Sequence, residues 1–125
     1  MSVRGIRGAI TVSTDNPEAI QAATQRLLRA VLEANVTLES KDIASVWFTV
    51  TEDLHSAYPA AAARAMGWDQ VPLMCGQEIP VPGGLPSCIR VLIHWNTDLP
   101  QDKVNHVYLG DAARLRPDLE RIKQL

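Results

Sequence analysis

The fold of this chain is organised around residues 71–95, VPLMCGQEIPVPGGLPSCIRVLIHW. The Pro/Gly-rich segment at 80–86 separates two apolar runs, which predicts a hairpin-like unit of two strands at about 71–79 and 87–97. The first strand carries Cys75 and Glu78, and the second carries Arg90 among apolar residues. An arginine in that setting needs a partner, because an unpaired buried charge is very costly. The partner is either Glu78, in a structural salt bridge, or a ligand that lies between the two side chains.

Length and composition indicate one ordinary globular domain over residues 1–125. The net charge of −2 argues against a nucleic-acid partner, which would require a basic excess. The apolar runs are too short to span a bilayer, and the N-terminus MSVRGIRGAI has no signal-peptide core. We therefore expect a cytoplasmic protein with no membrane partner.

The basic residues are mostly arginine, nine against three lysines. Because a guanidinium grips a carboxylate bidentately, this bias favours a small anionic ligand, with plain solvent exposure as the alternative. Cys75 and Cys88 are expected to be free, buried thiols. The three histidines do not have zinc-ligand spacing, so we expect neither a metal nor a cofactor; they are His55, His94 and His106.

The remaining elements alternate strand and helix before the organising stretch. Strands are predicted at 3–13, 43–51 and 104–109, and helices at about 17–34 and 60–66. Asn16 and Pro17 form a helix start, and Asn35 is a candidate left-handed stop. Arg7 lies between Gly5 and Gly8 on the less apolar face of the first strand, which indicates either a ligand close to the backbone or a bulge.

This order predicts an α+β domain with a mixed β-sheet and helices mainly on one face. Apolar residues on the second face would stay wet in a monomer, so we expect an oligomer that covers it. Residues from about 111 to 125 are expected to be a mobile C-terminal tail.

Four segments then occur in a specific order and spacing, namely VRGIRGAITV, PLMCGQE, GGLPSCIRVLIHWNTD and PQDKVNHVYLGDAARLRPDL. Together they resemble the small monofunctional bacterial chorismate mutases of the AroH type. The resemblance implies a homotrimer with a barrel-like core and active sites between subunits. It implies the Claisen rearrangement of chorismate to prephenate, in phenylalanine and tyrosine biosynthesis, without a cofactor.

The resemblance also assigns roles to individual positions. Arg90, against the ether oxygen, and Glu78, near the ring, would be the catalytic residues. Arg7 and Tyr108 would hold carboxylates, and Cys75 would meet the ring hydroxyl, although a small buried hydrophobe is its other interpretation. The remaining expected substrate contacts are Met74, Gly76 and Gln77 in the pocket wall, Tyr58 and Arg64 from a neighbouring subunit, and Leu115 and Arg116 in a closing tail segment.

Two positions depart from the family pattern: Met74 replaces a threonine, and Ala61 replaces a lysine found in some members. We expect the contact at position 74 to be made by backbone, and the change at 61 to affect substrate capture more than chemistry. The alternatives are a non-catalytic trimer that binds a small carboxylate, an enamine/imine hydrolase on a similar scaffold, and a purely structural trimer.

Overall fold

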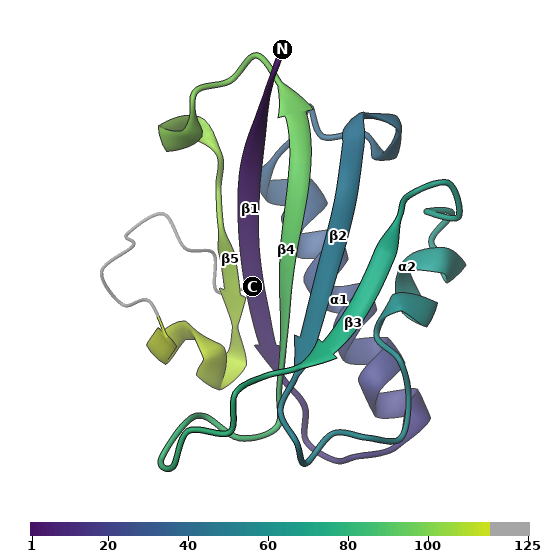
Figure 1. Cartoon of the computed structure of the whole chain (residues 1–125), viewed down its shortest axis with the longest axis vertical. Helices are drawn as coiled ribbons and strands as arrows, with labels where there is room; N and C mark the ends of the chain where they lie inside the picture. Colours follow the sequence, from purple (N-terminus) through teal and green to yellow (C-terminus); the bar gives the residue numbers. More distant parts are fainter. Residues whose placement is uncertain (116–125) are drawn as a thin grey trace.

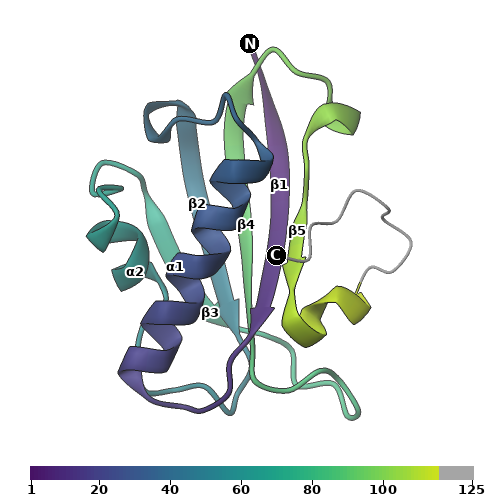
Figure 2. The same ribbon diagram turned by 180° about the vertical axis from the view of Figure 1, so that it is seen from behind.

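The computed structural model describes residues 1–115 as a five-stranded sheet with two α-helices on one face (Figures 1 and 2). The strands are β1 (Ser2–Thr11), β2 (Ile43–Val50), β3 (Leu73–Gln77), β4 (Cys88–Thr97) and β5 (Val107–Leu109), and the α-helices are α1 (Pro17–Ala34) and α2 (Ala60–Ala65). Short 3-10 helices occupy Ser40–Asp42, Gln101–Lys103 and Gly110–Leu115. Arg116, one of the expected site residues, lies outside the described residues, as does most of the expected mobile tail.

Helix α1 begins as the sequence predicts and ends differently. Asn16 Oδ1 accepts a hydrogen bond from the Ala19 amide at 2.8 Å, and Pro17 occupies the first turn. The left-handed stop expected at Asn35 is wrong, because this residue has φ −128°. Its side-chain amide instead donates to the carbonyls of Val31 and Asn105, both at 2.9 Å, which closes the helix end with side-chain hydrogen bonds.

The strand order is β3-β2-β4-β1-β5, so the hairpin-like pairing expected within residues 71–95 is wrong. Strand β2 lies between β3 and β4, parallel to β3 and antiparallel to β4. The reason is the β2–α2–β3 crossover, which returns the chain parallel to β2 at the sheet edge. Strand β1 pairs antiparallel with β4 from Ser2↔Thr97 to Thr11↔Cys88, and parallel with β5.

The predicted alternation along β4 is confirmed. Its residues Ile89, Val91, Ile93 and Trp95 are buried in the core that the sheet forms with α1. Neither α-helix of residues 1–115 lies on the opposite sheet face, which is toward the viewer in Figure 1. On it Trp47 is 43% and Leu92 37% exposed, so an apolar second face remains uncovered in the single chain. Within residues 1–115, no helix has the length and apolar character needed to cross a membrane.

Candidate active site

Arg90 lies at the centre of the sheet on the helix-free face. It stands opposite Ala9 of β1 and Thr49 of β2, and its side chain is about one-third exposed. Its Nε is 3.4 Å from Glu78 Oε2, but among residues 1–115 this buried nitrogen has no well-aligned hydrogen-bond acceptor. The Arg90–Glu78 contact is therefore an ion pair in which the Arg90 Nε–H makes no well-aligned hydrogen bond within residues 1–115.

Glu78 follows β3 directly, rather than lying within the strand as the sequence pattern suggests. Its backbone amide donates to the Val50 carbonyl at 2.8 Å, which fixes the chain beside the end of β2. Glu78 Oε2 also accepts a hydrogen bond from Thr49 Oγ1 at 3.0 Å. The carboxylate is thus held from two sides, by a guanidinium and by a hydroxyl.

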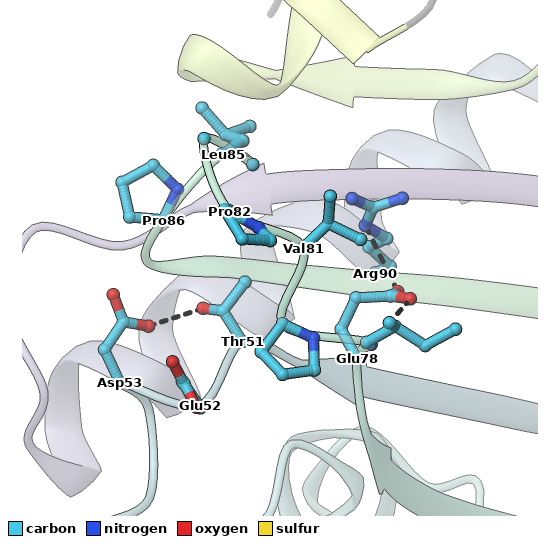
Figure 3. A pocket seen from close by; sticks show the side chains of 13 residues that line it. Thr51, Glu52, Asp53, Glu78, Val81, Pro82, Leu85, Pro86 and Arg90 are labelled. Carbon is cyan, nitrogen blue, oxygen red and sulfur yellow. Dashed lines mark hydrogen bonds and ion pairs between the residues drawn. The ribbon is translucent and has the colours of Figure 1, made fainter.

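An open cleft of about 510 Å³ lies over this pair on the helix-free face. Arg7, Glu78 and Arg90 line it together, as the sequence predicts, so two guanidinium groups and one carboxylate share a single hollow. A second hollow, of about 620 Å³, lies on the side of the loop at 79–86 and is also lined by Glu78 and Arg90 (Figure 3). The resemblance favoured substrate between Glu78 and Arg90 in place of a salt bridge, and this is wrong for the single chain, in which the ion pair and the open cleft occur together.

Tyr108, on the short strand β5, is expected at the site but does not line this cleft. Its side chain is 2% exposed and packs in a small cluster with Ala9, Cys88 and Ala112, against which Leu115 is partly buried. The Tyr108 hydroxyl has no hydrogen-bond partner among residues 1–115. Because buried hydroxyls are nearly always bonded, this orphan donor indicates a missing polar partner such as a ligand.

Arg90 also lies close to the buried thiol of Cys88. Burial raises the pKa of Cys88, and the positive charge of Arg90 opposes that rise. The thiol is therefore a neutral, unreactive group at physiological pH, as expected for a buried cysteine. Cys75 is also free, as predicted, but only partly buried.

The other expected site residues lie elsewhere on the single chain. Tyr58, Cys75 and Gly76 line a separate hollow of about 330 Å³. Met74 and Tyr58 are 56% and 74% exposed, and Arg64 and Gln77 also lie at the surface. One chain therefore does not bring these residues together with Arg7, Glu78 and Arg90.

Several residues at the cleft were missed by sequence reasoning, namely Trp47, Thr49, Leu92 and His94. The alternation along β2 did place Trp47 and Thr49 on one face. Thr49 lies directly opposite Arg90 in the β2–β4 pairing. The sequence could not identify Thr49 because that register is known only from the structure.

The chain was also compared with known proteins. The family model for chorismate mutase type I matches residues 3–119. Two relatives described as chorismate mutase AroH are similar to this chain. The relative from Thermus thermophilus is 63% identical over 118 residues, which cover 94% of this chain and 97% of the relative. That of Bacillus subtilis (strain 168) is 46% identical over 124 residues, covering 98% and 97%.

Among solved structures, a chorismate mutase from Clostridium thermocellum superposes with a TM-score of 0.85 at 52% identity, covering 88% of this chain and 97% of that one. The fold and the sequence thus lead to the same family along nearly the whole chain. The resemblance in the four sequence segments is confirmed, and the chain belongs to the chorismate mutase type I family.

Proposed function

We propose that this chorismate mutase, an isomerase of aromatic amino acid biosynthesis, rearranges chorismate to prephenate in the cleft lined by Arg7, Glu78 and Arg90. In this reaction the ether carbon–oxygen bond breaks and a carbon–carbon bond forms within one molecule, so no atom is gained or lost. The observation that carries the proposal is the Arg90 guanidinium, which lines an open cleft and whose buried Nε has no well-aligned acceptor within the described part of the chain.

The first task of the site is orientation. Chorismate carries two carboxylates, and its reactive shape must be selected from a flexible ensemble, which is an effect worth several kcal/mol when the geometry is held. Arg7 supplies a cation at one end of the cleft, and the orphan hydroxyl of Tyr108 supplies a buried hydrogen-bond donor. Both groups suit a carboxylate.

The second task is to stabilise charge that develops in the transition state. Negative charge grows on the ether oxygen as its bond to carbon lengthens, and a guanidinium N–H of Arg90 would meet it. Positive character grows on the ring, where the Glu78 carboxylate would compensate it. Thr49, through its 3.0 Å hydrogen bond to Glu78 Oε2, keeps that carboxylate in place. No step requires a nucleophile, so Cys75 serves as a polar contact.

We further propose a cytoplasmic homotrimer in which the helix-free sheet faces pack together into a barrel-like core. The exposed apolar side chains Trp47, Met74 and Leu92 support this arrangement. It would bring exposed Tyr58 and Arg64 of one subunit to the cleft of its neighbour. The residues Met74 to Gln77 would line the shared pocket, and Leu115 with Arg116 would close it.

The direct test is to incubate the purified protein with chorismate and to follow both chorismate and prephenate by NMR. We expect stoichiometric conversion with no added metal or cofactor, and a trimer mass by light scattering. Saturable binding without conversion would instead identify the carboxylate-binding alternative. Release of ammonia from an imine substrate, with no turnover of chorismate, would identify the hydrolase.

A further inference from the structure

Asp53 lies just beyond β2, away from the cleft that contains Arg7, and its carboxylate is saturated with hydrogen bonds. Oδ1 accepts from Thr51 Oγ1 at 2.5 Å, a contact that Figure 3 marks. The Ser87 amide donates to both oxygens, at 3.2 and 3.0 Å, and Ser87 Oγ lies 3.3 Å from Oδ2. These hydrogen bonds hold the pKa of Asp53 below its usual 3.8, so the carboxylate is ionised throughout the physiological range.

Ser87, the residue that Asp53 binds, has an unusual backbone. Its φ is +52°, and among residues 1–115 it is the one non-glycine residue in the left-handed region. That conformation is disfavoured for side chains with a Cβ and persists only when neighbouring groups hold it. Two such groups are present: Asp53 accepts the Ser87 N–H, and the Val12 amide donates to the Ser87 carbonyl at 2.8 Å.

The end of β2 holds both ends of the loop at 79–87. At the loop start, the Glu78 amide donates to the Val50 carbonyl at 2.8 Å. At the loop end, the Thr51 amide donates to the Cys88 carbonyl at 3.1 Å, and Thr51 Oγ1 accepts from the Cys88 amide at 3.0 Å. The Thr51 hydroxyl donates its single proton to Asp53, so its oxygen lone pairs remain available to accept the hydrogen bond from the Cys88 amide.

We propose that Asp53 is a positioning residue for the reaction: by holding Ser87 and Thr51, it sets the start of β4 and the path of the loop, and so keeps Arg90 facing Glu78. Asp53 does not line the cleft that Arg7, Glu78 and Arg90 share, although it lines the neighbouring hollow with Glu78 and Arg90. Arg90 stands two residues beyond Cys88, and Glu78 directly precedes the loop, so a shift of this end of β4 moves one member of the pair relative to the other. The inference rests on the proposed function only for its kinetic consequence.

The kinetic test compares Asp53→Ala and Asp53→Asn with Asp98→Ala. Asp98 is the matched control, since its carboxylate is 89% exposed and pairs with the N-terminus at 3.6 Å. We expect Asp53→Ala to lower kcat about 10- to 100-fold with a smaller change in KM, because a misplacement of about 1 Å has effects of this size. Asp53→Asn keeps one acceptor for Thr51 and should lie between wild type and Asp53→Ala.

Amide hydrogen exchange in the free enzyme separates positioning from a general loss of stability. We expect exchange at Ser87 and Cys88 to accelerate at least tenfold in Asp53→Ala, while amides in the centre of β4 stay protected. Adding Ser87→Gly should then recover part of the lost kcat, because glycine adopts φ +52° without strain. That rescue would not follow if Asp53 acted through stability alone.

Two results would overturn the inference: wild-type kcat in Asp53→Ala, or unchanged exchange at Ser87 and Cys88 in that variant. Uniformly faster exchange along β4 would equally reject it in favour of a structural role. If wild-type enzyme leaves chorismate unchanged, the proposed function fails, and the exchange measurement still decides whether Asp53 sets the loop.

Discussion

Replacing Arg90 by lysine tests the proposed chemistry most directly. The arginine places a planar fork of N–H donors in the cleft, with Nε 3.4 Å from Glu78 Oε2 and without an aligned acceptor among residues 1–115. Lysine keeps the positive charge but offers a rotating point donor, so it can satisfy Glu78 or the ether oxygen but not both in fixed geometry. Loss of one preorganised donor typically lowers kcat by about 10²–10³, or about 3–4 kcal/mol of transition-state stabilisation.

Folding stability should respond much less to the same change. The Arg90 and Glu78 side chains are 32% and 28% exposed, so solvent screens their ion pair, and pairs of this kind contribute about 0–1 kcal/mol. We therefore expect Arg90→Lys to remain folded, with the oligomeric state of wild type and a denaturation midpoint near that of wild type. Arg29→Lys, at an exposed position on α1, is the control for the substitution itself.

The assay is initial-rate conversion of chorismate over a range of concentrations, with light scattering on the same samples. A lysine variant with wild-type kcat would refute the role given to the guanidinium fork. Loss of activity together with a change in the oligomeric state seen for wild type would show that Arg90 acts on assembly, and would equally refute the electrostatic argument.

Four further outcomes follow from individual contacts. Tyr108→Phe should raise KM severalfold without lowering the melting temperature, because it removes a buried hydroxyl that has no hydrogen-bond partner among residues 1–115; a destabilised variant would show that the hydroxyl is bonded without substrate. Thr49→Val removes a 3.0 Å hydrogen bond to Glu78 and should lower kcat about fivefold, the equivalent of about 1 kcal/mol, so unchanged kinetics would mean that Glu78 needs no such support. Cys75→Ser should keep substantial activity, whereas near-complete loss or a covalent adduct in mass spectrometry would contradict a reaction without a nucleophile. The pKa of Asp15 is lowered chiefly by its hydrogen bond to Ser56. The stabilisation that the ionised carboxylate contributes is therefore fully present above the ordinary value of 3.8 and is lost as pH falls through the lowered pKa. Urea midpoints from pH 6 to pH 2 should decline less steeply in Asp15→Asn than in wild type, and parallel declines would contradict this.

Local patterns predicted the individual elements well because their causes are local. The cap at Asn16 depends on residues within one turn, and the alternation along β4 alone placed Arg90 on the face opposite Ile89 and Val91. The sequence also predicted that one sheet face stays uncovered, because both faces carry apolar residues and only two helices are available to cover them.

What could not be predicted depends on contacts between distant residues. Nothing in residues 71–95 shows that β2 separates β3 from β4, so proximity in the chain wrongly indicated a hairpin. The hydrogen bond between Asp53 and Ser87 joins residues 34 positions apart in the chain. The hydrogen bond between Thr49 and Glu78 joins residues 29 positions apart. Asn35 ends α1 through an asparagine 70 positions away. Arg90 and Glu78 were singled out from residue type, whereas the residues that support them were not.

The place of β1 between β4 and β5 also governs when the sheet can be completed. Arg7 binds the side chain of His106, which follows it by 99 residues, and Gly8 pairs with Val107. At about 5–20 residues per second, a ribosome delivers those partners roughly 5–20 s after the first strand is made. During that interval β1 lacks its pairing with β5, and pairing between segments so far apart in the chain forms slowly. Synthesis must therefore be almost complete before β5 can join β1 and complete the sheet.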